Sequence, residues 1–119
     1  MKDFRKLKVW QKAHRLTLKV YEATRKFPTE ELYGVTSQMR KISSSIPMNI
    51  AEGCGRGSDL DFSRFLQIAM GSASELEYQL ILARDLAYLG PDEYEDLNRD
   101  TAEVKRMLAP FIAKLKADR

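Results

Sequence analysis

The residues most able to perform chemistry are few, and their spacing assembles no catalytic or metal site. His14 is the only histidine and Cys54 the only cysteine among the 119 residues. A di-iron bundle needs a Glu-x-x-His motif on each of two helices, which one histidine cannot supply. Cys54 has no histidine or second cysteine at ligand spacing, and the glycines around Arg56 match neither common phosphate-binding motif. We therefore expect no enzymatic activity, no metal and no cofactor.

Basic side chains recur along the first predicted helix and form a candidate nucleic-acid contact. They step by three, four or seven residues on the face away from the apolar residues, interrupted only by Glu22: Arg5, Lys8, Lys12, Arg15, Lys19 and Lys26. At about 1.5 Å per residue, Arg5 to Lys19 spans roughly 21 Å, enough to follow several phosphates. A merely solvated helix face is the alternative interpretation, although such a face usually mixes both signs of charge.

The net charge of +3 conceals an uneven distribution. Residues 1–26 hold nine basic and two acidic residues, whereas residues 27–119 hold eleven basic and fifteen acidic ones. The positive charge therefore belongs to the first helix, which favours an anionic partner such as RNA or DNA.

A second polar row lies beside the apolar residues of the second predicted helix. Its members step by three or four residues: Gln38, Lys41, Ser45, Asn49, Glu52 and Arg56. The third helix offers a partner set: Arg64, Glu75 and Gln79. These side chains either face solvent or form a hydrogen-bonded seam within the bundle or between subunits. Such a seam would specify register, because an unpaired buried polar group costs about 1–3 kcal/mol.

Small residues cluster on the same two helices: Ser43, Ser44, Ser45 and Ala51, then Gly71, Ser72, Ala73 and Ser74. Small side chains let helix axes approach closely. A glycine inside a helix costs about 1 kcal/mol relative to alanine, so we expect Gly71 to have a packing reason. Contact within the bundle and contact between subunits both fit this pattern.

Four helical segments position these residues. Apolar side chains at steps of three and four predict helices over about 7–27, 30–53, 58–89 and 91–119. Pro28, the glycine-rich run 53–57 and Gly90-Pro91 separate the helices. The second pattern continues in phase through Pro47, so we predict one kinked helix there, and Pro110 should bend the fourth.

The predicted fold is all-α: a single domain over residues 1–119, built as an antiparallel up-down-up-down four-helix bundle with a kinked second helix. No segment alternates as a strand would, and short connections make sequential helices pack antiparallel. The third helix carries a second apolar stripe: Phe65, Ile68, Leu82, Leu86 and Leu89. Because one bundle core uses only one stripe fully, we expect this one to contribute to a homo-oligomer interface.

The expected compartment is the cytoplasm. No apolar run approaches the roughly 20 residues that span a bilayer, and the charged N-terminal residues do not begin a signal peptide. A single cysteine allows no internal disulfide, which fits a reducing environment.

The second helix also carries a recognisable motif. Residues 45–56, Ser-Ile-Pro-Met-Asn-Ile-Ala-Glu-Gly-Cys-Gly-Arg, resemble the signature of the 23S rRNA intervening-sequence protein family. These are small bacterial four-helix bundle proteins, named for reading frames inside insertions in ribosomal RNA genes. Residues 9–13, 33–40, 62–69, 71–72 and 75–77 resemble other blocks of the family, and the resemblance extends from about residue 4 to 89. Met48 and Tyr78 stand where we expect a smaller or more polar residue, a departure that affects packing and not the fold.

The resemblance implies a homopentamer around a central channel. It extends to accessory proteins of diversity-generating retroelements, pentameric bundles that bind a reverse transcriptase and nucleic acid through basic surfaces. The wider family has no established biochemical activity, so the resemblance bears more on assembly than on function. We expect a non-enzymatic oligomeric bundle that binds RNA or DNA, or assists a nucleic-acid enzyme, through Arg5, Lys8, Lys12, Arg15 and Lys19. The alternative is a protein-interaction scaffold with no nucleic-acid role.

Overall fold

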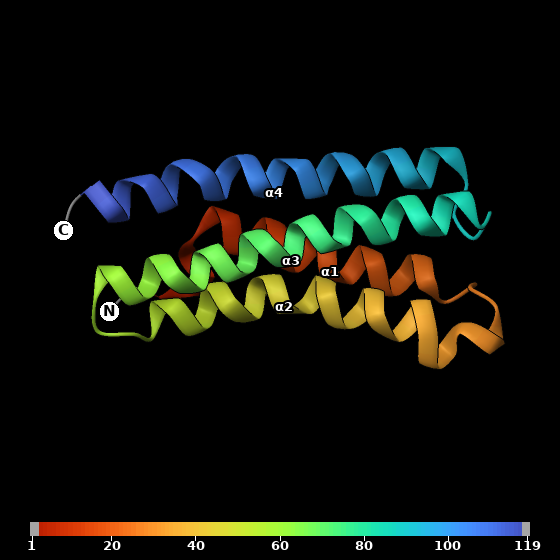
Figure 1. The fold of residues 1–119 in the computed structure, drawn as a ribbon, viewed down its shortest axis with the longest axis horizontal. Helices are drawn as coiled ribbons and strands as arrows, with labels where there is room; N and C mark the ends of the chain where they lie inside the picture. The colour runs from red at the N-terminus through yellow and green to blue at the C-terminus, as the bar shows by residue number, and fades with distance from the viewer. Residues whose placement is uncertain (1–2, 118–119) are drawn as a thin grey trace.

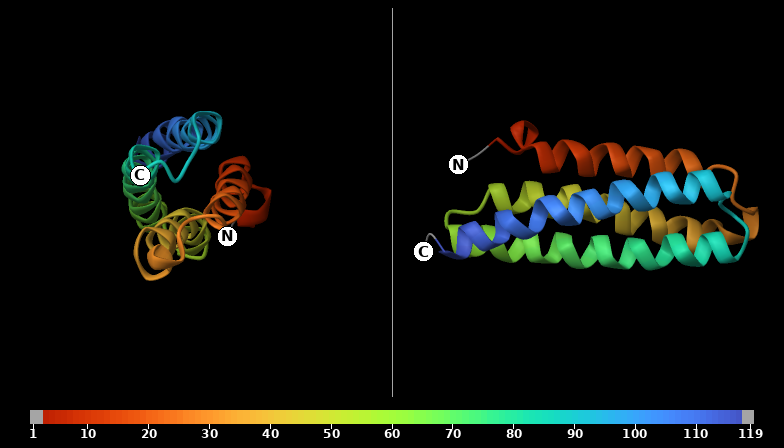
Figure 2. Two further views of the ribbon diagram at one scale, coloured as in Figure 1. Left: turned by 90° about the vertical axis from the view of Figure 1, so that its right-hand side faces the viewer. Right: turned by 90° about the horizontal axis from the view of Figure 1, so that it is seen from above.

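Four long helices pack side by side in the computed structural model, which describes residues 3–117 (Figure 1). They are α1 (Lys8–Thr24), α2 (Ser37–Cys54), α3 (Asp59–Asp85) and α4 (Pro91–Ala117). Sequential helices run antiparallel, and α4 returns to contact α1. Viewed along the bundle, α1, α2, α3 and α4 follow one another around the axis (Figure 2). The predicted up-down-up-down bundle is confirmed, with dimensions of 46 × 22 × 20 Å.

The core is built from the apolar stripes predicted for each helix. Its largest fully buried apolar side chains come from all four helices: Leu16, Val20, Met39, Ile46, Ile50, Leu66, Leu76, Leu80, Val104 and Leu108. The second helix runs through Pro47 as a single helix, as predicted, and α4 likewise runs through Pro110. Apolar burial along steps of three and four explains why four amphipathic segments form one bundle.

The start of α2 differs from the prediction. The helix expected after Thr29 begins at Ser37, behind a 3₁₀ turn (Thr29–Glu31) and a π-helical turn (Leu32–Thr36). Gly34 has non-helical angles, φ −115° and ψ −115°. The Glu31 carboxylate accepts hydrogen bonds from the Val35 N–H at 3.3 Å and from the Tyr88 hydroxyl at 2.8 Å. These side-chain hydrogen bonds replace regular helical hydrogen bonds in this segment. The regular helix therefore starts about two turns after the predicted position.

The end of α3 also differs, because the helix stops at Asp85 and not near Leu89. Ala87 adopts the left-handed conformation, with φ of 64°. The Tyr88 N–H then donates to the Ala83 carbonyl at 2.8 Å, and the Ala87 N–H donates to the Arg84 carbonyl at 2.9 Å. This is the Schellman arrangement, which closes a helix C-terminus, usually with glycine at the left-handed position.

Close approach of α2 and α3 depends on Gly53. A Cβ at this position would lie 2.8 Å from Phe62 Cδ1 and 2.9 Å from Phe65 Cβ. The Phe62 ring is buried and packs edge-on against Phe111, with centroids 5.3 Å apart. Gly53 therefore serves contact between these two helices, which share the most extensive packing in the bundle.

Candidate functional site

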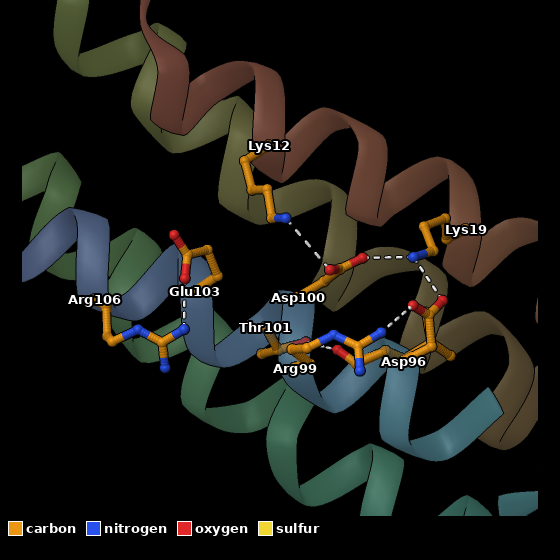
Figure 3. Close-up of polar contacts among 9 residues, drawn as sticks. Lys12, Lys19, Asp96, Arg99, Asp100, Thr101, Glu103 and Arg106 are labelled. Carbon is orange, nitrogen blue, oxygen red and sulfur yellow. Dashed lines mark hydrogen bonds and ion pairs between the residues drawn. The ribbon is translucent and has the colours of Figure 1, made fainter. Parts of the chain in front are cut away.

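The basic row of α1 meets acidic side chains of α4 along half of its length (Figure 3). The Lys19 ammonium lies 2.6 Å from carboxylate oxygens of both Asp96 and Asp100. Lys12 lies 3.3 Å from the second Asp100 oxygen, and Lys26 pairs with Glu93. The acids missing from the first helix are therefore supplied by the fourth, and three of the row's cations join α1 to α4.

Electrostatics at this junction keep its groups charged. The Asp100 side chain is only 15% exposed, and this burial by itself would raise its pKa. The ammonium groups of Lys19 and Lys12 outweigh the burial, so the pKa of Asp100 lies below its ordinary value. Burial would likewise lower the pKa of Lys19, but the carboxylates of Asp100 and Asp96 raise it. An ion pair held in this way stabilises the bundle and offers no proton donor or acceptor near neutral pH.

The remaining basic positions stay at the surface. Lys8 and Arg15 are exposed, and neither makes an ion pair within residues 3–117. Arg5 is also exposed, pairing with Asp3 at 3.3 Å and lying over the Phe4 ring. The cations of the basic row that α4 does not hold are therefore Arg5, in the turn before α1, and Lys8 and Arg15 in α1.

The polar row of α2 makes mostly local contacts. Asn49 Nδ2 donates to the Ser45 carbonyl at 2.7 Å within α2, and Glu52 near the end of α2 pairs at 3.2 Å with Arg56 in the turn that follows. The Arg56 guanidinium reaches α3, where it lies 4.7 Å from the centroid of the Phe65 ring. A role for Asn49, Glu52 and Arg56 in fixing α2 against a neighbour stays a prediction.

Of the three α3 residues predicted to face the polar row, Gln79 is buried, whereas Arg64 and Glu75 are exposed. Gln79 is buried and its Nε2 donates to Gln38 Oε1 on α2 at 3.1 Å. Its own Oε1 has no hydrogen-bond partner among the described residues. Arg64 pairs with Asp61 at 3.3 Å on the same helix, and Glu75 points to solvent without an ion pair in the described chain. The Gln38–Gln79 contact is thus the direct hydrogen bond between the two rows.

The second apolar stripe of α3 is only partly covered. Leu89 is buried, and Phe65 and Leu82 are half-buried. Ile68 and Leu86 remain exposed, and Ile68 keeps 50% of its surface. Gly71 is also exposed, and a Cβ there would meet nothing within 4 Å among the described residues. The protomer described here contains no packing reason for this mid-helix glycine.

A groove between α1 and α2 was not recognised from the sequence. It has a volume of about 420 Å³ and a mainly apolar lining: Phe4, Trp10, His14, Thr17, Leu18, Tyr21, Ser44, Pro47, Met48 and Ala51. Trp10 stacks on His14 with ring centroids 5.0 Å apart, and Phe4 packs edge-on against Trp10 at the same distance. The spacing of Trp10, His14, Leu18 and Tyr21 by four, four and three was the available signal, because it marks one flank of the helix.

Metal-ligating side chains do not gather in the part of the chain that the structure describes. Residues 3–117 contain no group of three or more His, Cys, Asp or Glu side chains placed to hold a metal ion. Cys54 is buried beside the core. No helix in the described chain combines the length and apolarity required to cross a membrane. Three surface features are candidates for function: the groove, the outer side of α3 and the exposed cations Arg5, Lys8 and Arg15.

Comparison with known proteins identifies the family of this bundle. No curated protein matches the chain. A crystal structure from Bacteroides thetaiotaomicron VPI-5482, of a protein with unknown function from the S23 ribosomal protein family, is similar with a TM-score of 0.82 and 27% identity. The similarity covers 88% of this chain and 95% of that one. The family model described as 23S rRNA-intervening sequence protein matches residues 5–110. The chain therefore belongs to the 23S rRNA-intervening sequence protein family.

Proposed function

We propose that this protein is a non-enzymatic helical scaffold that assembles with copies of itself, as a homopentamer according to the family resemblance. The observation that carries the proposal is the open apolar groove between α1 and α2. Its rim side chains Leu18 and Met48 keep 56% and 67% of their surface exposed. Contiguous apolar surface of this kind usually marks an interaction site, because leaving it in water is unfavourable.

Light scattering after size exclusion tests this proposal directly. We expect a particle several times heavier than the 13.7 kDa protomer at micromolar concentration. Met48→Glu places a charge in the groove and should reduce the particle mass, whereas Ala113→Glu, at an exposed position of α4, should not. A parent protein that elutes as a clean monomer would refute the scaffold function.

Nucleic-acid binding is the second candidate, supported by the exposed cations Arg5, Lys8 and Arg15, which follow one another at steps of three and seven. On a multimeric ring, such weak phosphate contacts would be multiplied by avidity. Binding should depend steeply on salt, because each neutralised phosphate releases counterions. Sequence preference should be weak, since contacts to phosphates carry no base information.

A salt titration against structured and single-stranded RNA tests this second function. The informative variant is Lys8→Glu with Arg15→Glu, because Lys12 and Lys19 hold α4 and their replacement would disturb the fold. We expect this double variant to lose binding while keeping its helical content. Equal affinities for parent and variant, or no binding at low salt, would refute this second function, and only the scaffold function would remain.

A further inference from the structure

The outward side of α3 carries a row with the spacing of a helix-packing seam. Ile68, Gly71, Glu75, Tyr78 and Leu82 follow one another at steps of three, four, three and four. This spacing places them on one face of α3, a helix that contributes no residue to the lining of the α1–α2 groove. Tyr78 keeps 60% of its surface exposed, so other parts of the protomer do not cover this side chain.

Gly71 is the residue of this row that contacts within the protomer explain least. Its helix-interior position costs about 1 kcal/mol relative to alanine. The space where its Cβ would stand is open to at least 4 Å among the described residues, so contact within the protomer does not explain the glycine. A glycine between two exposed large side chains, Ile68 and Tyr78, instead allows another helix backbone to approach α3 closely.

The α1–α2 groove matches this row in length and in charge. Ile68 to Tyr78 spans about 15 Å of helix, and the groove flank from Trp10 to Tyr21 spans about 17 Å. Lys41 lies one helical turn before the groove residue Ser44 and is exposed. Neither Lys41 nor Glu75 makes an ion pair within residues 3–117, so each charge is available to the other.

We propose that the outward row of α3 docks into the α1–α2 groove of a second copy of this chain, with Glu75 of one copy opposite Lys41 of the next. This inference rests on the self-assembly proposed above and assigns its two surfaces. With α3 antiparallel to the neighbouring α2, Gly71 lies one turn from Glu75, beside Ser44. Ile68 lies seven residues from Glu75 and meets Met48, which lies seven residues from Lys41. In this register the apolar pair Ile68–Met48 and the charged pair Glu75–Lys41 are both matched, whereas Tyr78 and Leu82 lie beyond the end of the groove.

Because the two surfaces differ, the contact is head-to-tail. Each copy offers a row to one neighbour and a groove to another. Repetition of such a contact closes into a ring or extends as a filament, and it does not form a two-fold dimer.

A charge swap tests the register. We expect Glu75→Lys or Lys41→Glu alone to weaken association at least about tenfold, since like charges would face each other across the contact. The double variant, with the two charges exchanged, should recover association to within about threefold of the parent. Light scattering over a dilution series measures all four proteins. Single variants that assemble like the parent, or a double variant as weak as the singles, would overturn the pairing.

Enlarging Gly71 provides an independent test. Gly71→Leu should abolish assembly while keeping the helical circular dichroism, because its side chain has open space in the protomer. Ala113→Leu is the matched control, because it enlarges another small exposed residue, near the C-terminal end of α4 and outside the row, and it should assemble normally. A monomeric parent would refute the scaffold function itself. An oligomeric parent whose Gly71→Leu variant stays fully assembled would refute only the assignment of the α3 face.

Discussion

Replacing Gly53 by alanine should destabilise the bundle, although alanine is the better helix former. The added methyl would meet Phe62 Cδ1 at 2.8 Å, Phe65 Cβ at 2.9 Å and the Phe62 carbonyl oxygen at 3.3 Å. Helix propensity favours alanine by about 1 kcal/mol, whereas overpacking a core costs about 1–3 kcal/mol. The Phe62 ring has little room to retreat from the methyl because it already packs on Phe111. We therefore take the upper end of that range and expect a net loss of about 2 kcal/mol.

The assay is thermal and urea unfolding of parent and variant, followed by circular dichroism at one protomer concentration because assembly affects apparent stability. A loss of this size corresponds to a fall in Tm of roughly 6–10 °C for a chain of this length. Gly57→Ala is the matched control, since a Cβ there meets nothing within 4 Å and its φ is not positive. Gly57→Ala should leave Tm unchanged or slightly higher. A Gly53→Ala protein as stable as the parent would refute the close-approach argument.

Three further substitutions probe other features. Ala87→Gly should raise the free energy of unfolding by up to about 1 kcal/mol in urea titrations, because glycine adopts the left-handed conformation without a Cβ penalty; a destabilised variant would contradict this. Asp100→Asn should cost about 1–2 kcal/mol at neutral pH. The pKa of Asp100 is lowered in the folded protein, so its contribution to the free energy of unfolding is present above the unfolded pKa and is lost as pH falls through the folded pKa. On acidification below about pH 4, the parent should therefore lose more stability than the variant. Asn49→Leu should alter Tm or the particle mass, and no change in either would assign Asn49 to a solvated face.

Much of the fold could be predicted because each helix pattern is local. The buried rows of α1 and α3, from Val9 to Ala23 and from Phe62 to Ala83, follow steps of three and four that identify the core face without knowledge of the partners. Ser58 caps α3, with its hydroxyl accepting from the Asp61 N–H at 3.2 Å. Capping and amphipathic spacing operate within a few residues, so a single sequence contains them in full.

The differences arise where distant residues meet. The late start of α2 depends on Glu31 receiving the Tyr88 hydroxyl, a contact across 57 positions. The neutralisation of Lys19 depends on the register of α4 against α1, which is set by all four helices. A helical pattern in one segment contains neither the partner nor the register. For the same reason, the α1–α2 groove became visible only once both helices were placed.

The junction between α1 and α4 has a consequence for how the bundle forms and opens. The other three helix pairs join segments adjacent in sequence, so each can form as a hairpin with a short loop to close. The α1–α4 pairing joins the two ends of the bundle, has the least extensive packing of the four pairs and is bridged by Lys12, Lys19 and Lys26. We expect it to close last during folding and to open first in the native state. Amide protons of α1 and α4 facing this junction should exchange with solvent ahead of those between α2 and α3, and added salt should widen the difference.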